Sequence, residues 1–146
     1  MGIYYASPSA KPVSWRSIGK AEFTIPAYKD VTLQAEWKVP VDTKLYAIEP
    51  ESGFFGATLK LVAKLPTGAT KTVALINHWS PFWQGSYQFL KPVVLPKGTV
   101  LIATSRYKNT LGDSHDINHV PQEPREMRSG NDAQAERFWM HLAVSP

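Results

Sequence analysis

Short stretches of alternating apolar and polar residues are the clearest pattern in the sequence. Between residues 31 and 39 every second residue is apolar, which is typical of a β-strand that buries one face. Residues 57–65 largely repeat this pattern, and Pro66-Thr67-Gly68 then reverses the chain into residues 71–76, which predicts a hairpin. A last strand is predicted over residues 137–144, with one apolar face made of Phe138, Met140, Leu142 and Val144.

The rest of the chain predicts further strands and one long connection. Residues 87–90 and 93–95 read as strand segments, and a turn at Pro96-Lys97-Gly98 leads into a strand over residues 100–107. Residues 108–135 show little periodicity, so we expect one long loop, of a length that is often functional. Apolar residues nowhere recur at helical spacing over three turns. The fold class predicted is all-β, an antiparallel β-sandwich or jelly roll whose two sheets bury their inner faces.

Composition narrows the class of protein. The 146 residues fit a single domain, 1–146, that can bury a core without a disulfide or a structural metal. The absence of cysteine excludes disulfides, thiolate metal ligands and a cysteine nucleophile. The net charge of +4 comes from singly spaced lysines and arginines, which favours solvated strand faces over a nucleic-acid surface. The sequence shows neither a membrane span nor an export signal, so we expect a soluble chain without membrane insertion.

Several short motifs, spread over nearly the whole chain, resemble one family in their order and spacing. They are Gly2-Ile3-Tyr4-Tyr5-Ala6, Phe23-Thr24-Ile25-Pro26, Phe82-Trp83-Gln84, Leu95-Pro96-Lys97-Gly98-Thr99 and Tyr107-Lys108-Asn109, together with the strand over residues 45–50. This set resembles the C-terminal domain of the copper type II, ascorbate-dependent monooxygenases, the family of the peptidylglycine α-hydroxylating and dopamine β-monooxygenases. The resemblance implies a β-sandwich that binds one copper ion.

The copper ligands that the resemblance implies are substituted in this chain. In the family, a Pro-His-x-His-x-x-Gly segment supplies two imidazoles and a methionine on the last strand completes the site. The matching segment here runs Pro50-Glu51-Ser52-Gly53-Phe54-Phe55-Gly56, which puts Glu51 and Gly53 at the histidine positions. Trp139 stands at the methionine position, although a slip of one residue would place Met140 there. We therefore expect no copper, no other cofactor and no catalytic residue.

The resemblance also implies in what kind of protein and in which compartment the domain occurs. The first residues match the segment by which the family joins this domain to a preceding one, so we expect a larger protein or a complex, with a flanking domain or a protein partner. The family is usually found outside the cytoplasm, which implies an extracytoplasmic location, periplasmic or secreted. In such a setting the domain would act as a structural subunit.

Four histidines remain, and two of them form the best metal candidate. His115 and His119, with Asp116 or Asp113, offer two imidazoles and a carboxylate, a set that suits zinc or copper if the loop folds back on itself. The competing interpretation is a solvated polar loop. His141, which shares a strand face with Trp139, is interpreted as structural.

An aromatic stretch offers a candidate binding surface made of His78, Trp79, Phe82 and Trp83. Exposed aromatic side chains at a loop can anchor a partner's side chains or sugar rings. The competing interpretation is that they cap the sandwich core. Four glutamates could supply an acid–base pair for glycoside hydrolysis: Glu49, Glu51, Glu123 and Glu126. The sequence alone cannot place any two of them across a cleft at the required spacing.

These observations leave one leading hypothesis and two alternatives. The leading one is a non-catalytic, copper-less relative of the monooxygenase domain that serves as a binding or assembly module. The first alternative is an enzyme with a relocated mononuclear metal site on the His115/His119 loop. The second is a carbohydrate-binding module, which rests on analogy with other jelly rolls.

Overall fold

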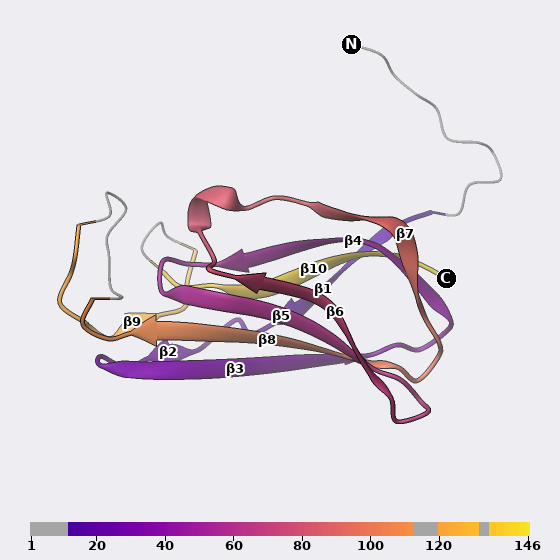
Figure 1. The fold of residues 1–146 in the computed structure, drawn as a ribbon, viewed down its shortest axis with the longest axis horizontal. Helices are drawn as coiled ribbons and strands as arrows, with labels where there is room; N and C mark the ends of the chain where they lie inside the picture. The colour runs from indigo at the N-terminus through magenta and orange to yellow at the C-terminus, as the bar shows by residue number, and fades with distance from the viewer. Residues whose placement is uncertain (1–11, 113–119, 132–134) are drawn as a thin grey trace, which may run out of the picture.

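Two four-stranded sheets pack face to face in the computed structural model, which describes residues 12–112, 120–131 and 135–146 (Figure 1). The first sheet has the strand order β1 (Ser14–Gly19), β10 (Phe138–Ser145), β4 (Thr43–Ser52) and β7 (Tyr87–Leu95). The second has the order β3 (Lys29–Lys38), β8 (Val100–Asn109), β5 (Gly56–Lys64) and β6 (Thr70–Asn77).

All neighbouring strands in both sheets run antiparallel, and the chain passes repeatedly from one sheet to the other. Eight long strands in two such sheets form a jelly-roll sandwich. The fold class predicted from the sequence is thus confirmed, as an open sandwich in which the described residues contain no α-helix.

The predicted alternation places the core where the sequence pattern indicates. Along β3 every second residue from Val31 is partly buried, and along β5 the fully buried residues are the alternating Leu59, Leu61 and Ala63. The β5–β6 hairpin turns at the predicted Pro66-Thr67-Gly68, where Gly68 adopts a φ of 88°. On β10, Phe138, Met140 and Leu142 are buried between the sheets. The largest fully buried side chains come from both sheets and include Tyr107, Phe138, Leu45, Leu59 and Leu101.

Two elements were missed by the sequence analysis. Strand β1 has one buried apolar residue, Ile18, so it carries no alternation that could have revealed it. The predicted loop over residues 108–135 is not wholly irregular, because β9 (Met127–Arg128) pairs with β2 (Thr24–Ile25). Asn109 is fully buried, and its side-chain amide donates to the carbonyl oxygens of Pro26 and Arg125 at 2.9 and 2.8 Å. This hydrogen bonding, together with the Met127 side chain of β9 that is buried in the core, holds the connection against the sandwich.

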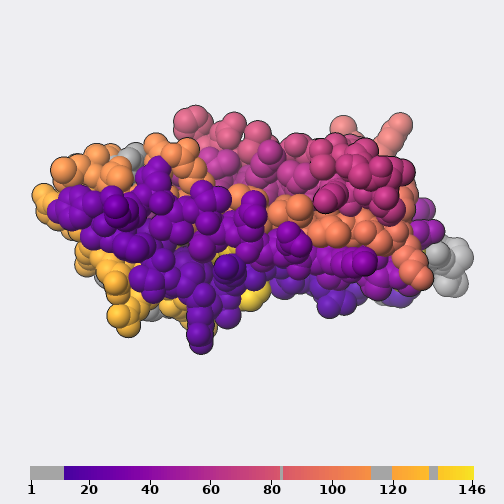
Figure 2. Space-filling view, turned by 90° about the horizontal axis from the view of Figure 1, so that it is seen from below, coloured from indigo at the N-terminus to yellow at the C-terminus, as the bar shows by residue number. Residues whose placement is uncertain are grey.

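The molecule is elongated along the strands, as Figure 2 shows, with purple residues of the early strands running along much of its length. At the end drawn on the left in Figure 1 lie the small β2–β9 sheet, the end of β4 and the 3₁₀ turn η1 (Pro81–Trp83). The sites described below lie at this end or on the outer face of the first sheet. Among the described elements there is no helix long and apolar enough to cross a membrane.

Candidate functional site

The end of β4 and the facing part of β10 contain the positions at which the resemblance would place copper ligands. Cα atoms of Glu51 and Trp139 are direct partners across β4 and β10, and Pro50 is the partner of Met140. The two substituted positions from distant parts of the sequence therefore lie side by side. They offer a carboxylate and an indole, which do not form a copper site of the expected kind.

A buried carboxylate occupies the space next to Gly53. Glu136, which is fully buried, accepts hydrogen bonds from the backbone N–H groups of Gly53 and Phe55 at 3.1 and 3.0 Å. A Cβ atom added to Gly53 would lie 2.5 Å from the carboxyl atoms of Glu136. Glycine at position 53 is thus a packing requirement, because any side chain would displace the carboxylate.

Burial dominates the electrostatics of Glu136. It raises the pKa of this carboxyl from 4.5 to about 7, against the lowering effect of the backbone amides of Phe55, Gly53 and Phe54 and of the charge on Arg137. Burial also raises the pKa of the nearby Tyr107 phenol well above its ordinary value. The Tyr107 hydroxyl donates to the carbonyl oxygen of Arg137, next to Glu136. The site therefore forms a compact internal polar cluster.

His141 takes part in a second polar network, on the outer face of the first sheet. Its Nδ1 shares a hydrogen bond of 2.8 Å with Ser17 Oγ, and its Nε2 lies 3.5 Å from Glu51 Oε1. The ring lies 6.4 Å from that of Trp139, at an interplanar angle of 21°. A hydroxyl, an imidazole and a carboxylate also form the catalytic triad of serine hydrolases, but Ser17 sits exposed on a paired sheet strand and does not line a pocket among the described residues. The network joins β1, β10 and β4, which agrees with a structural role for His141.

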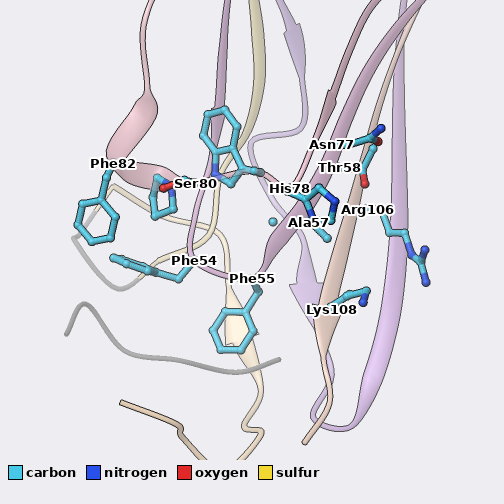
Figure 3. Close-up of a pocket in the computed structure, with 13 residues that line it drawn as sticks. Phe54, Phe55, Ala57, Thr58, Asn77, His78, Ser80, Phe82, Arg106 and Lys108 are labelled. Atoms are coloured by element: carbon cyan, nitrogen blue, oxygen red, sulfur yellow. The ribbon is translucent and has the colours of Figure 1, made fainter. Parts of the chain in front are cut away.

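An open cleft of about 520 Å³ lies where the β4–β5 connection meets the segment after β6 (Figure 3). Its aromatic side holds Phe54 and Phe82, whose ring centroids are 5.9 Å apart in an edge-to-face arrangement at 74°. Phe82 keeps 54% of its surface exposed. Such a pair presents an apolar surface to solvent, which is the arrangement expected of a binding site rather than of a core.

The other side of the cleft is polar and cationic. In Figure 3, Thr58, Asn77, Arg106 and Lys108 lie across from the phenylalanines, with His78 between the two groups. Arg106 forms an ion pair of 2.6 Å with Asp30, and among the described residues no Asp or Glu lines the cleft. This side of the lining therefore carries cationic side chains and hydrogen-bond donors.

Backbone hydrogen bonds hold the cleft in shape. The N–H of Lys108 donates to the carbonyl of Phe55 at 2.9 Å, and the N–H of Trp79 donates to that of Ala57 at 3.1 Å. His78 adopts a φ of 56°, in the left-handed region that costs energy for a residue with a side chain. A strained residue between two paired segments is typical of a functional site.

The structure brings together part of the predicted aromatic surface and corrects another part. His78, Trp79 and Phe82 all line the cleft. Trp79 is only 8% exposed and packs in the core, so its expected role as an exposed anchor is wrong. The turn η1 folds back over the sandwich, and the indole packs inward as the alternative interpretation predicted. The Trp83 side chain lies outside the described part of the structure.

The sequence analysis did not single out Arg106, Lys108, Phe54 or Glu136 as site residues. Arg106 falls within the strand predicted over residues 100–107, Lys108 is the first residue of the predicted loop, and Glu136 has no periodic context. The metal candidates His115, His119 and Asp116 lie outside the described residues. Within residues 12–112, 120–131 and 135–146, no three His, Asp or Glu side chains are arranged to share a metal ion. No protein-family model matches the chain, and neither does any curated protein.

Proposed function

We propose that this protein is a non-catalytic binding or assembly module whose ligand site is the cleft between Phe54 and Phe82 on one side and Arg106 and Lys108 on the other. The observation that carries this proposal is the lining itself. Aromatic and cationic side chains line an open cleft of about 520 Å³, within the size range of ligand sites. Apolar area supplies affinity there, and the polar groups supply orientation.

The proposal includes descent from the copper-binding monooxygenase domain, with the copper chemistry lost. Two features support the loss. Gly53 has no side chain to offer a metal, and the space beside it is filled by the Glu136 carboxylate. Glu51 is already paired with His141. Copper titration should therefore reveal no tight stoichiometric site, whereas a sub-micromolar site abolished by Glu51→Ala would contradict this part of the proposal.

We also propose that the domain works within a larger protein or complex outside the cytoplasm, as the resemblance implies. Photocrosslinking tests the binding role directly. A p-benzoylphenylalanine at position 82 should give a discrete crosslinked product in extracts of the source cells, suppressed by excess unmodified protein. The matched control carries the same group at position 90, where Leu90 is fully exposed on β7 of the other sheet. Equal crosslinking at both positions, or none at 82, would contradict the proposal.

A carbohydrate-binding module is the second candidate, favoured by one observation on the outer face of the first sheet. Trp15 is 54% exposed and lines a shallow pocket of about 270 Å³ with Glu49, Glu51 and His141. An exposed indole can stack on a sugar ring, and the carboxylates can accept from its hydroxyl groups. Glycan-array binding that disappears in Trp15→Ala would favour this candidate over the cleft.

The relocated metal site of the 113–119 segment stays a prediction. Elemental analysis of the purified protein tests it cheaply. One equivalent of zinc or copper that is lost on His115→Ala or His119→Ala would establish a metal site.

A further inference from the structure

We propose that the shallow pocket on the outer face of the first sheet binds the guanidinium group of an arginine side chain from a partner protein. The indole ring of Trp15 stacks on this group, and the carboxylate of Glu49 accepts its hydrogen bonds. This role goes beyond the proposed function, because it belongs to a second surface. The pocket and the cleft at Phe54 and Phe82 share no lining residue.

The strand register places the ring and the carboxylate on one face of the sheet. Ser17 on β1 and Glu51 on β4 both contact His141 on β10, at 2.8 and 3.5 Å, so these three side chains share that face. Trp15 lies two residues before Ser17 along β1, and therefore points the same way. Glu49 likewise lies two residues before Glu51 along β4. All but Ser17 line one pocket of about 270 Å³.

The spacing of the strands lets one cation reach both sides of the pocket. Only β10 lies between β1 and β4, so the strands that carry Trp15 and Glu49 are about 10 Å apart. A cation about 6 Å from a ring centroid and about 2.8 Å from a carboxylate oxygen spans a similar distance, about 9 Å. A single group held between the indole and the carboxylate therefore matches the width of the pocket.

Trp15 supplies the aromatic side of the pocket. Its side chain is 54% exposed, and no ring or cation of the described residues lies over it. The next residue of β1, Arg16, shows the chemistry that such a ring supports, because its guanidinium lies 5.4 Å from the ring centroid of Trp37. The Trp15 indole offers a partner the same kind of contact.

Glu49 supplies the negative charge. Glu51 is already paired with His141, whereas within the described part of the chain Glu49 makes no ion pair and no side-chain hydrogen bond. The two carboxylates are about 7 Å apart along the strand, so a cation next to Glu49 is also attracted by Glu51. No described Lys or Arg lines the pocket. A neutral sugar could stack on the same indole, but it would gain nothing from this charge.

The shape of the pocket favours a guanidinium over an ammonium group. A guanidinium is planar and weakly hydrated, so its face can stack on an indole while its edge donates to a carboxylate. An ammonium group is compact and strongly hydrated. Because the pocket is shallow, it offers few contacts to replace that hydration. A shallow site on a strand face is also accessible to a side chain that projects from another protein.

Three capped amino acids test the ligand class by titration against the ¹⁵N-labelled full chain. N-acetyl-arginine-methylamide carries the guanidinium, the citrulline analogue is neutral with nearly the same shape, and the lysine analogue keeps the charge without the plane. We expect the arginine compound to shift the indole N–H of Trp15 and the backbone amides of Glu49 and His141. The citrulline compound should bind about fivefold to twentyfold more weakly, because it loses both the cation–π contact and the ion pair. The lysine compound should fall between the two.

Variants connect the affinities to the two sides of the pocket. Trp15→Leu should weaken the arginine compound by about threefold, through loss of the ring. Glu49→Gln should weaken it by a similar factor and leave the citrulline compound unchanged. The matched control is Glu36→Gln, which removes the same charge from an exposed position on β3 of the other sheet and should change no affinity. Thermal midpoints within a few degrees of the parent show that each variant is folded.

Three results would overturn the arginine site. Equal affinities for the arginine and citrulline compounds would show that charge is not recognised, and equal affinities for arginine and lysine would show that a guanidinium is not selected. An equal loss in Glu36→Gln and Glu49→Gln would reveal a general response to net charge. The crosslinking experiment at position 82 probes the cleft alone, so the two sites can fail separately.

Discussion

Two neighbouring residues of the short β4–β5 connection, Gly53 and Phe54, have very different surroundings. Around Gly53 the molecule is closed, because the buried carboxylate of Glu136 occupies the space that a side chain would need. One residue further on, Phe54 lies at the open cleft with Phe82. The same backbone segment thus forms an internal polar cluster on one side and a solvent-facing aromatic surface on the other.

This difference shows how one strand end can be closed on one side and open to solvent on the other. The amides of Gly53 and Phe55 both point at Glu136, so the hydrogen-bonding capacity of the connection is used internally. The side chains of Phe54 and Phe82 form the surface on the outer side. Binding in this protein should accordingly depend on the exposed side chains of the cleft. Stability should depend on the closed side around Gly53 and Glu136 and on the buried Trp79 side chain.

The largest effect on stability is expected from Trp79→Ala, because this side chain lies buried behind the cleft that it lines. Truncating a buried indole should lower the free energy of unfolding by about 4 kcal/mol, through lost burial and a residual cavity. Denaturant unfolding of the intact chain measures the loss. Trp79→Phe should cost much less, since it keeps a ring and removes an indole N–H that is buried without an acceptor among the described residues. Equal effects of the two variants would contradict the assignment of Trp79 to the core.

Gly53→Ala should have the next largest effect. Its Cβ would meet the Glu136 carboxyl at 2.5 Å, and displacing a buried, hydrogen-bonded carboxylate should cost about 3 kcal/mol. Gly85→Ala is the matched control, because a Cβ there meets nothing within 4 Å. We expect its thermal midpoint to stay within a few degrees of that of the parent protein. A neutral Gly53→Ala would mean that the strand end is open and able to hold a ligand.

The ionisation of Glu136 should make stability depend on pH. Its pKa is raised from 4.5 to about 7 on folding, so the folded state binds the proton more tightly than the unfolded state. The free energy of unfolding should therefore be highest below about pH 4.5, as far as this group is concerned, and should fall by about 3 kcal/mol as the pH rises through about 7.

Glu136→Gln isolates this contribution from the other titrating groups. The neutral amide cannot ionise, so the difference in unfolding free energy between parent and variant should shift in favour of the parent as the pH falls from 8 to 4.5. Chemical denaturation at several pH values gives the two curves. Parallel curves would show that Glu136 does not titrate in this range and that the site is hydrated or otherwise compensated.

The contrast between the two sides also explains what the sequence could reveal. Alternation over residues 31–39 and 57–65 is local, so the strands and the sandwich could be predicted from it. Glu136 could not, because its partners Gly53 and Phe55 are more than eighty residues away and contribute backbone amides, which every sequence contains. The aromatic stretch around Trp79 was recognisable as a cluster. Which of its rings point inward depends on how η1 folds back, and that is decided by packing rather than by local pattern.

The smallest effect on stability is expected on the open side, from Phe82→Ala. Because the ring is 54% exposed and touches Phe54 at one edge, its removal should change the free energy of unfolding by less than about 1 kcal/mol. Urea unfolding alongside the Trp79→Ala variant gives the comparison on a single scale. A loss close to that of Trp79→Ala would mean that Phe82 completes the core and that the cleft is a packing defect rather than a site. A small loss would separate the residues that hold the fold together from those that line its exposed cleft.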